Sequence, residues 1–187
     1  MFDARKKIVM SKVDHSKKGS VDKEVKPLLD VINSKPFFYT TSSCAGRIVL
    51  LKSPKSGKKK DAEWLFVSHG VVGASIKDKL KNLPDDLVWL KMESFILHVC
   101  VKDLEIADRL MDTLRCVGLK HSGILNTRKR IIVEIITSDR MDVPIAKDKT
   151  MLVSPKYFEF LIALANKKLL DSRKRMEKLK DALTDFN

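Results

Sequence analysis

The sequence has little glycine, proline and cysteine, and it contains no long apolar run. Seven glycines and six prolines among 187 residues exclude a collagen-like or mainly disordered chain. The longest stretch without a charged residue, 64–76, has 13 residues, whereas a membrane-spanning helix needs about 20 apolar residues. Charged side chains are scattered through residues 1–13, unlike the apolar segment of a secretory signal. We therefore expect an unprocessed, cytoplasmic protein without a transmembrane segment.

The cysteines and histidines do not form a metal-binding or disulfide pattern. Cys44, Cys100 and Cys116 are odd in number and include no close pair, which argues against a disulfide framework and a tetrahedral zinc site. The four histidines lack the spacing of metal ligands. We expect reduced thiols and no metal.

Two common nucleotide-binding motifs are also missing. The chain has neither the G-x-x-x-x-G-K-[ST] phosphate loop nor a G-x-G-x-x-G motif between a strand and a helix. ATP hydrolysis and a Rossmann-type cofactor site are therefore unsupported.

Positive charge is abundant. Lysine and arginine number 37 against 24 acidic residues, which gives a formal net charge of +13. Such a chain attracts polyanions, of which nucleic acid is the commonest in the cytoplasm, although a lysine-rich proteome gives a similar balance. Basic runs occur at 52–60, 128–130 and 167–175, and their alternative interpretation is solvated surface. As substrate-binding candidates we select Lys58, Lys59, Arg128 and Arg130.

Hydrophobic periodicity predicts interleaved helices and strands. Helices are expected over 2–13, 21–34, 75–83, from 103 or 104 to 117, and from 157 to the end of the chain. Strands are expected over 37–41, 48–52, 64–68, 88–92, 95–101, 131–137 and 143–146. Several strand pairs have the spacing of hairpins, so we predict a non-Rossmann α+β fold with a mixed, mostly antiparallel sheet and a long C-terminal helix. No linker is visible, and we expect one domain over 1–187.

Two polar segments between the expected elements are candidate sites, because loops on a scaffold commonly carry function. The first runs from Asp14 to Gly19 and offers a carboxylate, a hydroxyl and ammonium groups; the alternative is that these side chains satisfy the backbone at a helix boundary. The second, Thr40–Arg47, has five consecutive hydroxyl- or thiol-bearing residues, and glycine and arginine complete it. These groups suit a carboxylate or phosphate, whereas an ordinary hairpin turn is the alternative.

A nucleophile in the second segment would need a base. Cys44 or Ser43 could use His69, at a strand end, or His98. His98 lies between two apolar residues within a strand, so we interpret it as a structural, half-buried histidine.

Together, the two segments resemble a known family. They contain the runs Asp14-x-Ser16-x-Lys18-Gly19-x-x-Asp22, Ile32-Asn33 and Thr40-Thr41-Ser42-Ser43-Cys44-x-Gly46-Arg47-Ile48. Further matches are Ser68-His69, Leu90-Lys91-x-Glu93, Leu97-His98-Val99, Ser122-Gly123, Pro144 and Ala165-Asn166. In order and spacing, the chain is similar to the tRNA wybutosine-synthesising methyltransferase family, which modifies a tricyclic guanosine derivative. Ala45 and Ser94 depart from the family pattern, so neither receives an essential role.

The resemblance implies an S-adenosylmethionine-dependent enzyme that methylates N4 of a demethylwyosine-type base beside the anticodon of phenylalanine tRNA. As a hypothesis, Ser42, Ser43, Gly46 and Arg47 bind the methionyl carboxylate or a polar edge of the substrate. Asp14, Ser16 and Lys18 lie across the cleft, with Ser16 and Lys18 contacting the substrate. Asp14 and His69 are the candidates for accepting the proton.

Two other function classes stay open. A non-catalytic RNA-binding protein would use the same basic segments without binding a cofactor. A hydrolase would use Cys44 and His69. We expect a monomer.

Overall fold

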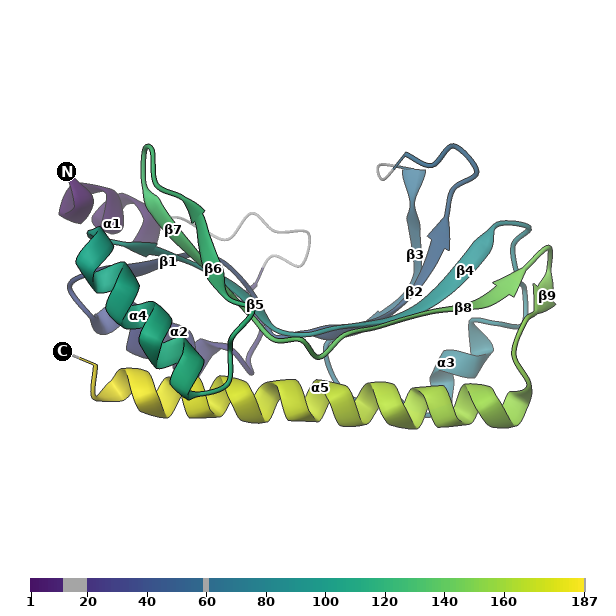
Figure 1. Cartoon of the computed structure of the whole chain (residues 1–187). Helices are drawn as coiled ribbons and strands as arrows, with labels where there is room; N and C mark the ends of the chain where they lie inside the picture. Colours follow the sequence, from purple (N-terminus) through teal and green to yellow (C-terminus); the bar gives the residue numbers. More distant parts are fainter. Residues whose placement is uncertain (12–19, 59–60, 187) are drawn as a thin grey trace. The chain divides into compact units, whose positions relative to one another are not determined.

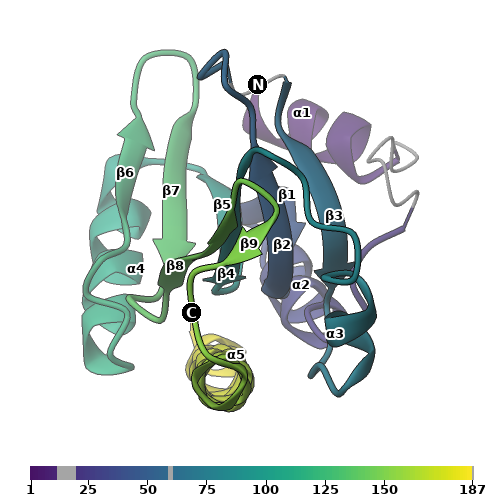
Figure 2. The same ribbon diagram turned by 90° about the vertical axis from the view of Figure 1, so that its right-hand side faces the viewer.

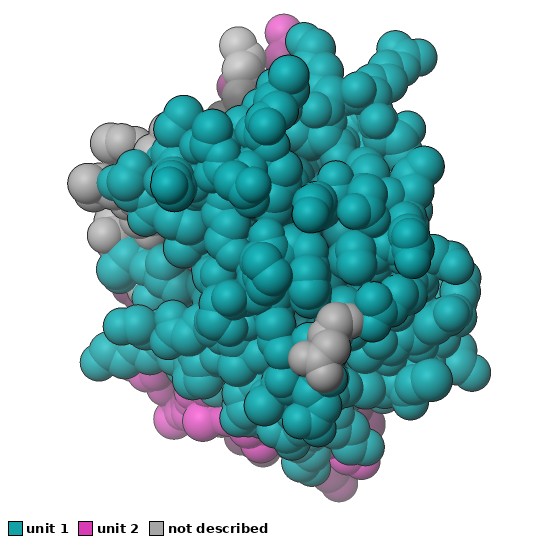
Figure 3. Space-filling model, turned by 90° about the vertical axis from the view of Figure 1, so that its left-hand side faces the viewer, with its two compact units in different colours: residues 1–45, 95–138, 172–187 teal, residues 46–94, 139–171 magenta. Residues whose placement is uncertain are grey.

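The structure is a computed structural model that describes residues 1–11, 20–58 and 61–186. The chain separates into two compact units, each built from segments that are distant in sequence (Figure 3). Unit 1 comprises 1–45, 95–138 and 172–187, and unit 2 comprises 46–94 and 139–171. The single domain expected over 1–187 stays a prediction. Within the described residues, no helix combines the length and apolar character needed to cross a membrane.

Unit 1 contains a four-stranded sheet in the order β1-β5-β7-β6, and every pairing in it is antiparallel (Figure 1). Its strands are β1 (Phe38–Cys44), β5 (Ile96–Val101), β6 (Gly123–Asn126) and β7 (Ile131–Ile136). Its helices are α1 (Phe2–Met10), α2 (Lys26–Ser34), α4 (Leu104–Cys116) and the last part of α5 (Pro155–Thr184).

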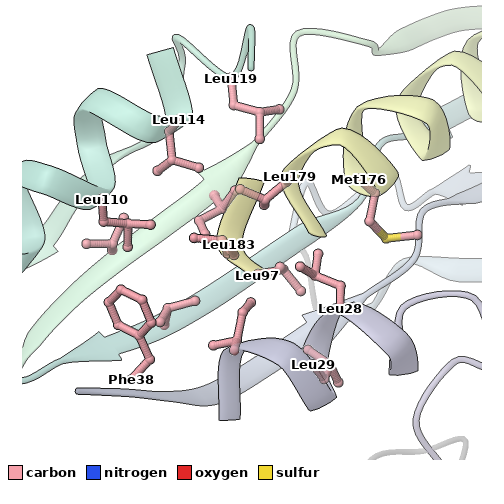
Figure 4. Packing of buried hydrophobic residues seen from close by; sticks show 14 of the residues in the cluster. Leu28, Leu29, Phe38, Leu97, Leu110, Leu114, Leu119, Met176, Leu179 and Leu183 are labelled. Carbon is pink, nitrogen blue, oxygen red and sulfur yellow. The ribbon is translucent and has the colours of Figure 1, made fainter. Parts of the chain in front are cut away.

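Helices cover both faces of this sheet. On one face, α2, α4 and the end of α5 bury their apolar stripes against β1, β5 and β7 (Figure 4). Leu28, Leu110 and Leu179 represent the three helices, and each is at most 1% exposed. On the other face, Phe2 and Val9 of α1 pack on the cluster formed by Tyr39, Cys100 and Ile132.

Local signals explain the boundaries of α4. The Asp103 carboxylate accepts a hydrogen bond from the backbone N–H of Ile106 at 2.9 Å, which caps the first turn. Gly118 follows the helix with φ = 85°, a conformation that glycine adopts without strain. The helix predicted from the periodicity is therefore present with nearly the expected limits.

Unit 2 contains a five-stranded antiparallel sheet in the order β3-β2-β4-β8-β9 (Figure 2). Its strands are β2 (Arg47–Ser53), β3 (Glu63–Ser68), β4 (Leu87–Glu93), β8 (Met141–Lys147) and β9 (Thr150–Met151). The short helix α3 (Ser75–Asp78) and the first part of α5 bury Ile76, Leu161 and Ala165 against Leu50 and Leu90 of this sheet. One face of the sheet is thereby covered.

The α+β class, the antiparallel pairing and the long C-terminal helix are confirmed, but the strands form two sheets where the sequence suggested one. The reason lies in two short links. Only Ala45 and Gly46 separate β1 from β2, and only Ser94 and Phe95 separate β4 from β5. Links of this length are typical of hairpins, yet β1 pairs with β5 and β2 pairs with β4. The chain passes from one sheet to the other at both links.

Several other boundaries differ from the expectations raised by the sequence; the helix expected over 75–83, for example, ends at Asp78. The helix expected from residue 21 begins at Lys26, with Pro27 in its first turn, where the missing N–H costs little. The C-terminal helix begins at Pro155, two residues earlier than expected. The strand Gly123–Asn126 was not anticipated, because its four residues show no clear alternation.

Candidate functional site

The hydroxyl-rich segment lies mainly within strand β1, so the expectation that it forms a loop is wrong. Ser42 pairs with His98 and Ser43 pairs with Leu97 in the antiparallel ladder, and the register shifts between Thr40 and Ser42. Such an irregularity redirects side chains locally. Ser42 is exposed and Ser43 is half-buried. A strand edge fixed by a ladder presents these hydroxyls more rigidly than a turn does.

The start of β1 is fixed by an asparagine on α2. The Thr40 N–H donates to Asn33 Oδ1 at 2.8 Å, and Asn33 Nδ2 donates to Thr40 Oγ1 at 3.0 Å. Thr41 Oγ1 donates to the carbonyl oxygen of His98 at 3.2 Å. The hydroxyls of Thr40 and Thr41 therefore already form hydrogen bonds within the protein. Ser42 and Ser43 are the better candidates for binding a ligand.

His98 has a structural partner. Its Nε2 lies 3.1 Å from Glu134 Oε1 on the neighbouring strand β7, and both side chains are half-buried. This contact agrees with the interpretation of His98 as a structural histidine. His69 is thus the better candidate for a base.

Asp22 positions the end of β1. Its side chain is only 5% exposed, and Oδ2 accepts a hydrogen bond from the backbone N–H of Ala45 at 2.8 Å. Asp22 belongs to the sequence run that resembles the family, but no local pattern indicates this contact across 23 positions. Asp22 is therefore a candidate positioning residue for the segment that follows Cys44, a role that the sequence analysis did not assign to it.

Arg47, the first residue of β2, is fixed by two contacts within unit 2. Its Nε donates to Glu93 Oε2 at 2.5 Å on the adjacent strand β4. Its guanidinium lies 4.4 Å from the ring centroid of Trp64, a cation–π geometry. The side chain remains 25% exposed. Because the ion pair engages Nε, the other guanidinium nitrogens can still donate toward an anion.

His69 follows the last residue of β3, and the segment after it is fixed by side chains. Ser68 Oγ donates to the carbonyl of Gly70 at 3.0 Å and accepts from its N–H at 3.1 Å. The Asn166 amide, on α5, accepts from the N–H of Val72 and donates to its carbonyl, both at 2.8 Å. His69 itself is half-buried. These contacts restrict the backbone that carries the imidazole.

We expect Asn166→Ala to loosen this segment and to reduce both catalysis and stability. It removes both hydrogen bonds to Val72, each worth about 1 kcal/mol, so the free energy of unfolding should fall by about 2 kcal/mol. If His69 accepts a proton, its displacement should lower kcat by at least about tenfold. Denaturant unfolding and steady-state kinetics would measure the two effects. An unchanged kcat alongside lower stability would restrict Asn166 to a structural role.

The remaining predicted site residues fall in three places. Asp14, Ser16, Lys18 and Lys59 lie outside the described residues. Lys58 is exposed in the connection between β2 and β3. Arg128 and Arg130 are exposed in the turn between β6 and β7.

The described candidates for cofactor binding and catalysis divide between the units. Ser42 and Ser43 belong to unit 1, whereas Gly46, Arg47 and His69 belong to unit 2. Gly46 has φ = 88°, which glycine adopts readily at the start of the second unit.

Comparison with known proteins shows the class of this chain. Residues 4–185 match the family described as Methyltransferase TYW3, which identifies a methyltransferase. The chain belongs to the TYW3 methyltransferase family, as the resemblance in the sequence predicted. The match spans nearly the whole chain, so it includes both sheets and the terminal helix.

Individual relatives agree with this assignment. A protein of Thermococcus sibiricus named tRNA(Phe) 7-((3-amino-3-carboxypropyl)-4-demethylwyosine(37)-N(4))-methyltransferase is 35% identical over 97% of this chain and 94% of its own length. A tRNA wybutosine-synthesizing protein 3 homolog of Xenopus laevis is 34% identical over 92% of this chain and 70% of its own length. The solved structure of the PH1069 protein from Pyrococcus horikoshii has a TM-score of 0.91 and 32% identity, and the alignment covers 100% of this chain and 95% of that chain.

Proposed function

We propose that this protein is an S-adenosylmethionine-dependent tRNA methyltransferase that methylates N4 of a demethylwyosine-type base next to the anticodon of phenylalanine tRNA. The observation that carries the proposal is the similarity to the Thermococcus sibiricus enzyme of that name, 35% identical over 97% of this chain. The net charge of +13 suits a tRNA substrate.

The donor groups of the Ser42–Arg47 segment fit the methionyl end of the cofactor. A carboxylate accepts hydrogen bonds, and this segment offers three donors: the hydroxyls of Ser42 and Ser43 and the guanidinium of Arg47. Bound S-adenosylmethionine supplies a methyl group on a positively charged sulfur. In this proposal Ser42, Ser43, Gly46 and Arg47 orient the methionyl end.

The protein's part in the reaction is mainly positioning. Bound S-adenosylmethionine would supply the methyl group, and the base nitrogen that receives it would release a proton for a protein group to accept. Alignment and exclusion of water therefore dominate the rate. In this proposal His69 accepts the released proton, with Asp14 as the other candidate. Lys58, Lys59, Arg128 and Arg130 contact tRNA phosphates, and Ser16 and Lys18 contact the substrate. No metal is required, and we propose a cytoplasmic monomer.

Calorimetric titration tests the cofactor assignment. Wild-type protein should bind S-adenosylmethionine and S-adenosylhomocysteine saturably, and the double variant Ser43→Ala, Arg47→Ala should abolish that binding. A matched control is the double variant Ser34→Ala, Arg115→Ala, because both of these side chains are exposed on helices and lie outside β1 and β2. If wild-type protein binds neither ligand, even with tRNA present, a non-catalytic RNA-binding protein becomes the better interpretation.

We expect Arg47→Ala alone to weaken cofactor binding by about 10- to 100-fold, since a hydrogen bond to a charged group contributes about 1.5 to 3 kcal/mol. The protein should stay folded, because Arg47 is partly exposed and its pair with Glu93 lies at the end of the strand. Circular dichroism and methylation of phenylalanine tRNA that carries the precursor base would measure both effects. Methylation close to the wild-type rate would remove Arg47 from the site.

A further inference from the structure

Unit 1 has two adjoining cavities between α1 and the turn that joins β6 to β7. Their volumes are about 360 and 250 Å³. Both are lined by Arg5, Tyr39, Lys129 and Arg130, which shows that they adjoin. We call them together the α1 groove. Tyr39, which lines both cavities, belongs to the cluster on the sheet face that carries α1, opposite the face covered by α2 and α4.

The charged side chains that line the α1 groove are all basic. Five basic side chains line it, and none of the described lining residues is acidic. They are Arg5, Lys102, Arg128, Lys129 and Arg130. All five are exposed, so a ligand in solvent can reach them.

Two of these arginines interact with uncharged groups of the protein. Arg5 Nη1 donates to the carbonyl oxygen of Lys129 at 3.0 Å, which ties α1 to the turn. Arg130 and Tyr39 line the same two cavities, and the guanidinium acts on the Tyr39 phenol by lowering its pKa. Burial, followed by contact with Cys100, raises the pKa of Tyr39 despite the opposing effect of Arg130, so the phenol stays neutral at pH 7. These neutral neighbours do not cancel the charge of either guanidinium group.

Other arginines in the chain differ in this respect. Arg47, Arg115 and Arg140 each form an ion pair with a carboxylate of the same unit. An acidic neighbour reduces the attraction of an arginine for an external anion. The α1 groove therefore combines fixed geometry with positive charge that its own lining does not neutralise, which is the chemistry of a phosphate site.

We propose that the α1 groove binds phosphate groups of the tRNA backbone, as a contact surface separate from the residues assigned to the cofactor. This inference rests on the proposed function for its ligand, and it adds α1, Lys102 and Lys129 to the RNA-binding surface. Phosphate contacts set position and orientation without reading sequence. The groove should therefore contribute to tRNA affinity equally for tRNA with and without the precursor base.

The test compares two triple variants in which the same amount of positive charge is removed. The turn variant is Arg128→Ala, Lys129→Ala, Arg130→Ala. The control is Lys23→Ala, Lys26→Ala, Lys178→Ala, whose lysines are exposed elsewhere in unit 1. Neither variant removes the carbonyl of Lys129 that accepts from Arg5. The probe is an unmodified phenylalanine tRNA transcript, and its affinity is measured at several salt concentrations.

The turn variant should bind tRNA at least tenfold more weakly than the control. The slope of log affinity against log salt should shrink by about 0.7 to 0.9 for each phosphate that the turn variant no longer neutralises. Equal affinity and slope in the two variants would overturn the proposal, because only net charge would then matter. Competition by inorganic phosphate or adenosine monophosphate at micromolar concentration would also overturn it, since the groove would then be a small-molecule site.

Titration with S-adenosylmethionine separates this proposal from the proposed function. If wild-type protein binds tRNA but not the cofactor, the methyltransferase assignment fails, and the comparison of the two variants still decides the α1 groove. If wild-type protein binds the cofactor and the two variants bind tRNA alike, the groove assignment and the phosphate contacts of Arg128 and Arg130 fail, whereas the methyltransferase assignment stands.

Discussion

Replacing Asp22 with alanine should reduce methyl transfer by about 100-fold and lower the free energy of unfolding by about 2 to 3 kcal/mol. The carboxylate is 5% exposed and accepts from the backbone N–H of Ala45. Its removal leaves that buried N–H without this acceptor, which costs more than the loss of an exposed hydrogen bond because a buried donor left unpaired has no compensating contact with water. Ala45 immediately precedes Gly46 and Arg47, so the backbone displacement would occur within the proposed cofactor-binding segment.

Two substitutions control this experiment. Asp22→Asn keeps an oxygen acceptor but removes the charge, so it should retain more stability and more activity than Asp22→Ala. Asp30→Ala removes an exposed carboxylate from the neighbouring helix α2 and should change little. Urea unfolding, cofactor affinity and initial rates would be measured on all three. If Asp22→Ala is less stable but keeps the wild-type affinity for S-adenosylmethionine, Asp22 supports only the fold.

The sequence predicts the helices better than it predicts the sheets, and the reason is physical. The apolar stripe of α4 and its Asp103 cap are local signals, because the residues that form them are three or four positions apart. Strand partners depend on residues far away. Cys44 and Arg47 are close in sequence, yet they end and begin strands of different sheets. No local pattern distinguishes that arrangement from a hairpin.

The same distinction applies to the site. Similarity to the family marked Asn33, Glu93 and Asn166 as matching positions, but it assigned them no roles. In the structure they contact Thr40, Arg47 and Val72, at separations of 7, 46 and 94 residues. Residues that could contact a ligand have recognisable chemistry in the sequence. Residues that position them are recognised only when the fold brings their partners within hydrogen-bonding distance.

The C-terminal helix offers the largest expected change in stability. Leu179 is fully buried in the core of unit 1, in the same cluster as Leu28, Leu97 and Leu110 (Figure 4). We expect Leu179→Ala to lower the free energy of unfolding by about 3 to 5 kcal/mol, because the reduced apolar burial is accompanied by a cavity. A typical domain has only about 5 to 15 kcal/mol of stability, so the variant should unfold at a much lower urea concentration.

Leu170→Ala is the matched control for this prediction. Leu170 lies in the same helix but is 45% exposed. Both substitutions exchange leucine for alanine, so their effects on helix propensity are alike, and the difference between them measures burial. Urea unfolding should place the midpoint of Leu170→Ala near that of the wild type. Equal destabilisation by the two variants would mean that the end of α5 does not pack against the β1-β5-β7-β6 sheet. Since β1 of that sheet carries Ser42 and Ser43, the Leu179→Ala variant should also bind S-adenosylmethionine more weakly as it approaches its unfolding transition.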